Sequence, residues 1–212
     1  THCISSAASD VYKRQLFQQT LNPEQRKPAE DQIGQLQAQP GFGFLLLALV
    51  QSESTSTAIR LASAIQFKNL CKTRWNVDAE TEDPVFSAIS DDEKQAIRQQ
   101  LVPVLVSLAS ASTPSQAILS QMNESVALVA SSDFPEAWPA LIDELVSQLS
   151  TDNHHVLLSV LATSHAIFKQ WRSQFRSDAL YSEINLVLGK MANPLLELLQ
   201  RLSLIHISEP TR

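Results

Sequence analysis

Several features that would place this sequence in other classes of protein are scarce. Only 4 of its 212 residues are glycine, and its aromatic and β-branched residues do not form the short alternating runs that are typical of β-strands. The longest apolar run, residues 42–50, is about half of the roughly 20 residues that a membrane-spanning helix requires. We therefore expect neither a β-sheet protein nor a membrane span.

The sequence also lacks the clusters that mark nucleic-acid-binding proteins, metal sites and enzymes. The formal net charge is −6 and the basic residues are scattered, which disfavours a nucleic-acid partner. Cys3 and Cys71 cannot form a zinc motif with the scattered histidines, and no Ser-His-Asp or Cys-His set can be assigned. We therefore expect no enzymatic activity, no cofactor and no metal. The presence of only two cysteines, far apart in the sequence, favours a reducing intracellular compartment. Residues 1–15 also lack the apolar segment of a signal peptide.

Both ends of the chain resemble translated sequencing adapters from a transposon library. If Asp10 to Gln15 are read as GAT GTG TAT AAG AGA CAG, the reverse complement CTG TCT CTT ATA CAC ATC translates as Leu-Ser-Leu-Ile-His-Ile, which is Leu202 to Ile207. An inverted adapter at both ends of one DNA fragment produces this relation. We therefore expect residues 1–15 and 202–212 to be non-native and exclude them from fold and function. Residues 16–201 are then expected to be a fragment of a longer protein.

Residues 16–201 carry apolar residues at helical intervals, with Ala, Leu, Gln and Glu filling the longer segments. Asn22 followed by Pro23 predicts a helix that begins there and ends near Gln39, before Pro40-Gly41. An apolar helix is expected from Phe42, and a third helix from about residue 55 to 75. The predicted apolar face of this third helix is formed by Ala58, Leu61, Ala62 and Ile65.

Two pairs of residues have the spacing of a helix capping box, namely Ser90 with Glu93 and Asp133 with Glu136. The acidic stretch 76–89 contains Pro84, so we expect it to be a loop and the most mobile internal connection. Further helices are predicted after Pro114, from about residue 154, and from about residue 177 to 198. The large aromatic residues are predicted to pack in the core: Phe67, Trp75, Trp138 and Trp171.

The predicted helices recur as pairs. The first helices of successive pairs begin near residues 41, 91, 134 and 177, a period of roughly 43–50 residues, close to the ~40–47 of HEAT and armadillo repeats. Each pair has too little apolar surface to be stable alone and must stack on its neighbours. The sequence therefore predicts an all-α solenoid of antiparallel HEAT-repeat (armadillo-like) helix pairs, whose function is to bind other proteins.

Four stretches resemble the amino-terminal region of the importin-β superfamily. They are GFGFLLL (41–47), RLASAIQFKNLCKTRW (60–75), SSDFPEAWPALIDEL (131–145) and SHAIFKQWRSQFRSDALYSEINLVL (164–188). The segment that ends in Trp75 is shared across the superfamily, whereas the last two stretches are most similar to the exportin-2 (cellular apoptosis susceptibility) family of export receptors. The likeness covers nearly all of residues 16–201.

This resemblance implies a karyopherin that shuttles between nucleus and cytoplasm. It implies that GTP-loaded Ran and importin-α are bound together in the nucleus and that importin-α is returned to the cytoplasm, with importin-α bound only by the full-length receptor. Nucleoporins are further possible partners. By position, Ran is expected on the helix 55–75, with the polar candidates Arg60, Lys68, Asn69 and Lys72. Two alternatives stay open, namely an importer of the same superfamily and a general HEAT-repeat interaction scaffold.

Overall fold

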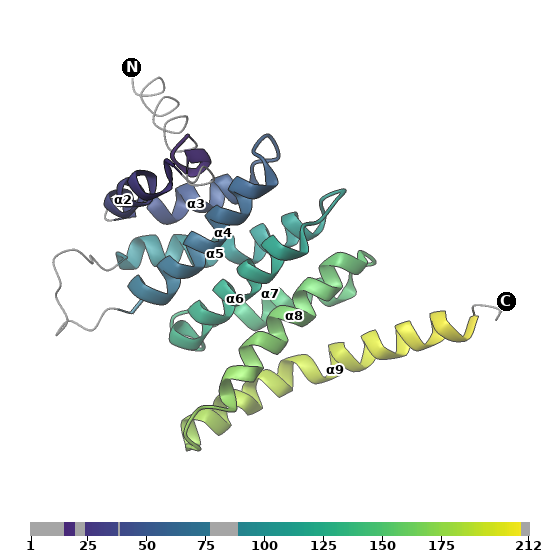
Figure 1. Ribbon diagram of the computed structural model, residues 1–212. Helices are drawn as coiled ribbons and strands as arrows, with labels where there is room; N and C mark the ends of the chain where they lie inside the picture. Colours follow the sequence, from purple (N-terminus) through teal and green to yellow (C-terminus); the bar gives the residue numbers. More distant parts are fainter. Residues whose placement is uncertain (1–14, 20–23, 38, 77–88, 209–212) are drawn as a thin grey trace.

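Every regular element is a helix in the computed structural model, which describes residues 15–19, 24–37, 39–76 and 89–208 (Figure 1). A short helical segment at residues 15–19 precedes α2. The elements that follow are α2 (Arg26–Gln37), α3 (Phe42–Gln51), α4 (Thr57–Arg74), α5 (Asp91–Ala109), α6 (Gln116–Asp133), α7 (Leu141–Ser147), the 3-10 helix η1 (Gln148–Ser150), α8 (His154–Trp171) and α9 (Asp178–Ser208). Over these ranges the predicted all-α fold is confirmed.

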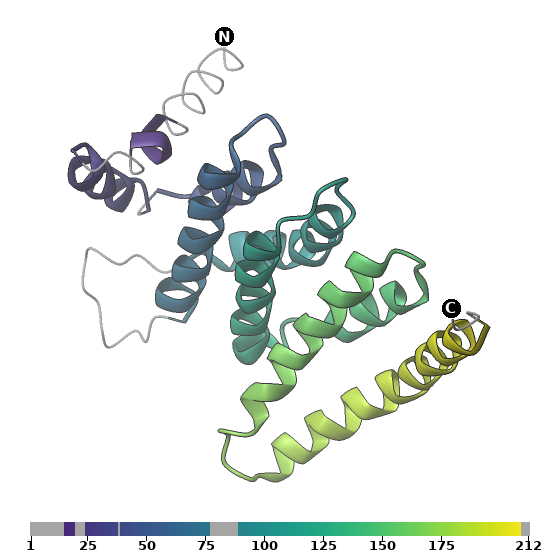
Figure 2. The same cartoon turned by 45° about the vertical axis from the view of Figure 1, so that its right-hand side comes forward.

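The helices form two layers, and consecutive helices alternate between them (Figures 1 and 2). One layer contains α4, α6 and α8 side by side, and the other contains α3, α5, α7 and α9. Helix α3 packs on α4 and α5 packs on α6, while η1, which directly follows α7, contacts α8. Neighbouring helices of the same layer also pack on each other, which is the arrangement of a HEAT-repeat solenoid. The core therefore runs as a continuous apolar seam between the layers rather than as a closed centre.

Turn residues set the start of α3 and α5. Gly41 has a φ of 82°, a left-handed conformation that favours glycine, and it precedes the first residue of α3. Ser90 caps α5 as predicted, because its Oγ accepts a hydrogen bond from the Glu93 amide at 3.3 Å. In a full capping box the Glu93 carboxylate would also accept a bond from the Ser90 amide, which is not the case here. Its Oε2 instead accepts from the Gly41 amide at 3.2 Å and so joins α5 to the start of α3.

Two sequence predictions fall on residues that the structure does not describe. Asn22 and Pro23, the predicted start of the first helix, lie outside the described residues, and α2 is described from Arg26. Residues 77–88, which make up most of the predicted mobile loop, also lie outside them.

The buried face of α4 differs from the predicted one. Ala58 is exposed and Ile65 is 37% exposed, while Leu61 and Ala62 are only partly buried. The buried residues are Ile59, Ser63, Ala64, Phe67, Leu70, Cys71 and Arg74. The prediction was wrong because α4 carries apolar residues around much of its circumference, and its neighbours α3 and α6 select the side that is covered.

The second predicted capping box is also wrong. Asp133 is the last residue of α6 rather than a cap, and α7 begins only at Leu141. Between them, the Asp133 carbonyl accepts bonds from the amides of Ala137 and Trp138, at 2.7 and 2.9 Å. The Asp133 carboxylate forms an ion pair with Arg98 of α5, with both side chains nearly buried. Prolines at 135 and 139 interrupt the helical hydrogen-bond ladder over this stretch, which delays the next helix.

The predicted packing role of the large aromatic residues is confirmed. Phe67, Trp75 and Trp138 are at most 4% exposed. Trp171 is partly buried, stacks on Phe168 with ring centroids 4.9 Å apart, and donates its Nε1 hydrogen to Glu183 of α9 at 2.8 Å. These contacts join α4 to the seam and α8 to α9.

Gly43 lies at a close approach of α3 to α5, and its replacement by alanine is expected to lower the free energy of unfolding by about 1–3 kcal/mol. A Cβ there would lie 2.8 Å from Ile97 Cδ1, and Ile97 is fully buried. At Gly34 in α2 a Cβ meets nothing within 4 Å, so Gly34→Ala should raise the free energy of unfolding by about 0.5–1 kcal/mol. Urea denaturation measures both, and a loss of equal size at the two positions would contradict the predicted contact.

Candidate protein interface

The candidate binding residues lie on α4, whose two sides differ sharply. Ser56 caps the helix by accepting a bond from the Ile59 amide at 3.5 Å. One side then packs into the seam, whereas Asn69 and Lys72 are exposed and Lys68 is partly exposed. Lys72 lies four positions after Lys68 and three after Asn69, so it is a neighbour of both on one side of the helix. α4 therefore presents a short polar strip with two lysines on the surface of its layer.

Lys68 is held by an acidic residue of the neighbouring helix. Its Nζ lies 3.4 Å from Oε2 of Glu124 on α6, with side-chain exposures of 22% and 57%. An exposed pair of this kind contributes at most about 1 kcal/mol, so it orients the lysine without withdrawing it from the surface. Glu124 was not among the predicted site residues. It lies 56 positions from Lys68, and only the packing of α4 on α6 brings the two together.

Arg60 stands apart from the other three predicted residues. It lies two turns nearer the start of α4 than Lys68, about 12 Å along the helix axis. Its Nε donates a hydrogen bond to the carbonyl oxygen of Val50 at 2.8 Å, which joins α4 to the end of α3. The structure therefore brings Lys68, Asn69 and Lys72 together and gives Arg60 a bond within the fold.

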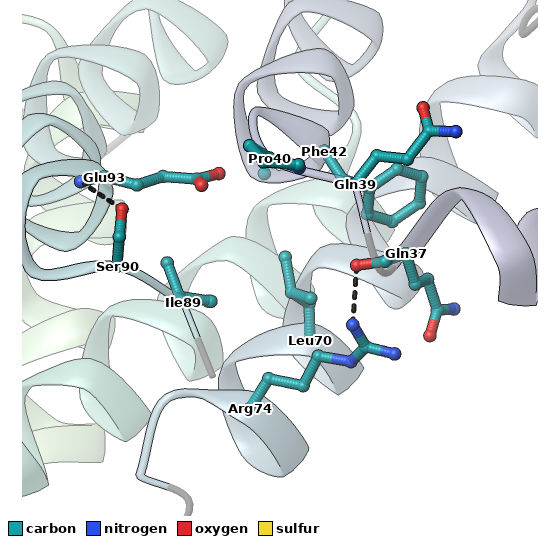
Figure 3. A pocket seen from close by; sticks show the side chains of 10 residues that line it. Gln37, Gln39, Pro40, Phe42, Leu70, Arg74, Ile89, Ser90 and Glu93 are labelled. Atoms are coloured by element: carbon teal, nitrogen blue, oxygen red, sulfur yellow. Dashed lines mark hydrogen bonds between the residues drawn. The ribbon is translucent and has the colours of Figure 1, made fainter. Parts of the chain in front are cut away.

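A hollow of about 150 Å³ lies at the carboxyl end of α4 (Figure 3). Gln37 and Arg74 line one side of it, and Ser90 and Glu93 line the other. Arg74 Nη1 donates to the Gln37 carbonyl at 2.6 Å, and burial lowers the pKa of this guanidinium. Because its polar groups join α4 to α2 and α5 to α3, we assign the hollow a structural role.

The single described cysteine is not placed for chemistry. Cys71 is buried within α4, and burial raises the pKa of its thiol well above the ordinary value, so the thiol stays protonated at neutral pH. His154 and His155 are exposed at the start of α8. Within the described ranges, no three His, Cys, Asp or Glu side chains are grouped so that they could hold a metal ion. The described helices also include none that is long and apolar enough to cross a membrane.

Two protein-family models match the chain. The importin-beta N-terminal domain matches residues 29–107, which include α3 and α4, and the Cse1 model matches residues 167–210. The first match covers the candidate surface of α4. The second covers the end of α8 and α9.

Characterised proteins and a solved structure resemble the chain over most of its length. Exportin-2 of Drosophila melanogaster is 34% identical over 186 residues, covering 87% of this chain and 18% of that protein. The importin alpha re-exporter of Saccharomyces cerevisiae is 38% identical over 174 residues, covering 82% and 17%. The exportin Cse1 in its cargo-free, cytoplasmic state matches with a TM-score of 0.78 and 32% identity, covering 90% of this chain and 20% of that one. The chain thus spans less than a fifth of the length of these two relatives.

Proposed function

We propose that this chain, as a member of the exportin-2 (Cse1) family of nuclear transport receptors, supplies part of the Ran-binding surface of an export receptor. The receptor binds GTP-loaded Ran and importin-α in the nucleus and returns importin-α to the cytoplasm. It shuttles between the two compartments through contacts with nucleoporins. The proposal assigns no catalytic step to the chain, whose relatives are named as exporters.

One observation carries the proposal for this chain. Lys68, Asn69 and Lys72 form a polar strip on a helix whose opposite side is buried, within the segment that matches the importin-beta N-terminal domain. A rigid helix presents such side chains with little loss of entropy on binding. Two cations on an otherwise acidic chain favour a partner with a complementary acidic patch. We assign Arg60 the lesser role, because its Nε is bonded to the end of α3.

The test is a titration of fluorescently labelled GTP-loaded Ran with the 212-residue chain. We expect weak binding, because the relatives are more than five times longer and a divided site loses a linkage gain of about 10²–10⁴. Lys68→Glu and Lys72→Glu should each weaken binding at least about tenfold, or about 1.4 kcal/mol. Lys190→Glu is the matched control, because it makes the same charge change on α9 of the other layer.

Three outcomes would contradict the proposal. Equal binding by the wild-type chain and both α4 variants would show that Ran does not contact this strip. An equal loss on Lys190→Glu would indicate a non-specific charge effect. Importin-α is expected not to bind measurably. Tight importin-α binding without Ran would contradict the export function. An exporter requires Ran to hold its cargo, whereas an importer releases its cargo when Ran binds.

We propose further that the two ends, residues 1–15 and 202–212, are adapter-derived and dispensable, and that residues 16–201 form the receptor's repeats. Leu16 and Phe17 are buried, whereas Gln15 is exposed. Arg201 donates to the carbonyls of Leu149, Ser150 and Thr151, whereas Leu202 is 43% exposed. The Cse1 match, however, runs to residue 210 and crosses the proposed boundary at 201.

Deletion of both ends decides this point. We expect the melting temperature to stay within about 2 °C, because adapter-derived ends were never selected to pack on the repeats, and changes away from packed features alter stability by no more than about 0.5 kcal/mol. The measurement is thermal unfolding by circular dichroism of the full chain and of residues 16–201. A large fall in melting temperature would show that the ends pack on the repeats. Separate deletions would then identify the end that is responsible.

A further inference from the structure

The turn between α8 and α9 carries an unusually exposed aromatic side chain. Phe175 is 90% exposed, the highest value among the large apolar residues that the structure describes. The turn lies at a free corner of the molecule, where α8 ends and α9 reverses direction (Figures 1 and 2). A phenylalanine ring exposes a large apolar area to water, so its coverage by a partner is favourable.

Three basic residues surround this ring in the sequence and have no acidic partner. Lys169, Arg172 and Arg176 make no ion pair with any residue in the described ranges. Asp178 follows them at the start of α9, and it is the acidic residue nearest in sequence to the turn. Among the residues that the structure describes, five other cations are paired with carboxylates: Lys68, Lys94, Arg98, Lys190 and Arg201. The turn is therefore a local positive patch on a chain whose formal net charge is −6.

The backbone of the turn is held in place by its own hydrogen bonds and by its neighbours. The amides of Arg172, Ser173 and Gln174 each donate to a carbonyl three residues earlier, at 3.1–3.3 Å. Trp171 bonds to Glu183 of α9, and Ser177 Oγ accepts from the Leu180 amide at 3.2 Å. Because the segments on both sides of Phe175 are held by these bonds, the entropic cost of presenting the ring and its basic neighbours to a partner is reduced.

We propose that this turn is a docking site for an acidic segment of a partner protein, with Phe175 inserted between the partner's apolar side chains. Unpaired cations around an exposed aromatic ring fit a chain that alternates carboxylates with apolar residues. A single-stranded nucleic acid fits less well, because its binding sites combine a long basic groove with several stacking rings. The site uses none of the α4 residues and does not depend on the proposed binding of Ran.

The experiment measures binding of a fluorescein-labelled synthetic peptide of repeated Asp-Glu-Leu units by fluorescence anisotropy at low salt. We expect the wild-type chain to bind it. Phe175→Ala and the double variant Arg172→Gln, Arg176→Gln should each weaken binding about tenfold or more. Leu199→Ala and Lys190→Gln, which change an exposed leucine and a cation elsewhere on α9, are the matched controls and should bind like wild type. Because Phe175 is almost fully exposed, its replacement should leave the helical circular dichroism unchanged.

Any of the following results would overturn the proposal. These are no binding by the wild-type chain, equal binding by the turn variants and wild type, an equal loss in the controls, or tighter binding of a single-stranded RNA of the same charge. A peptide of repeated Asp-Glu-Ser units separates the two parts of the site. It should bind more weakly than the leucine peptide, and Phe175→Ala should not weaken it further. Equal affinity for both peptides would show that Phe175 does not contribute to the site.

Discussion

Phe67→Ala is expected to lower the free energy of unfolding by about 3–5 kcal/mol. Phe67 is fully buried on α4, between the helices that pack on either side of it. Its removal loses the transfer energy of a whole ring and leaves a cavity, because close-packed helices collapse only partly around the space. Chemical denaturation in urea, followed by circular dichroism, measures the change through the shift of the midpoint.

Ile65→Ala is the matched control for this prediction, because it removes a large apolar side chain two positions away on the same helix. Ile65 is 37% exposed, so its truncation should cost less than about 1 kcal/mol. The comparison also tests which side of α4 is buried, since the sequence alone placed Ile65 in the core. A larger loss at Ile65 than at Phe67 would contradict the observed orientation of the helix.

Arg98→Met is the second change with a large expected effect, at about 3–5 kcal/mol of lost stability. The ion pair between Arg98 of α5 and Asp133 of α6 is nearly buried, with side-chain exposures of 14% and 10%. Removal of the cation leaves the Asp133 carboxylate in a poorly hydrated position without its partner. The cost comes mainly from this uncompensated charge, rather than from the energy of the pair itself.

Two variants separate this cause from a general loss of packing. The double variant Arg98→Met, Asp133→Leu removes both charges and should be more stable than Arg98→Met alone. Lys190→Met breaks a more exposed pair with Asp143, whose side-chain exposures are 33% and 63%, and should cost no more than about 1 kcal/mol. Urea denaturation of all three variants gives the comparison. If the double variant were less stable than Arg98→Met, the charge argument would fail.

Local signals predicted much of this fold. The Ser90 cap was found because it depends on an amide three residues away in the sequence. Helix α3 and the core positions of Phe67, Trp75 and Trp138 followed from apolar spacing. The capping box at Asp133 failed because the same spacing also occurs where a helix ends and prolines delay the next one.

The candidate surface was predictable only in part. The resemblance pointed to α4 and named Lys68, Asn69 and Lys72, which the structure places on one exposed side. It also named Arg60, whose bond to the Val50 carbonyl depends on how α3 packs against α4. Their role in binding Ran stays a prediction. Glu124 could not be found in this way, since no local pattern joins positions that are 56 residues apart.

The sequence by itself determined that the chain is helical, where most helices begin, and which family it resembles, because helix periodicity, caps and motifs are local properties of the chain. The tertiary structure alone decided which side of α4 is buried, which carboxylate holds Lys68, and that Asp133 pairs with Arg98. These features depend on the stacking of one helix pair on the next. A helix with apolar residues on several sides has no preferred orientation until its neighbours cover one of them.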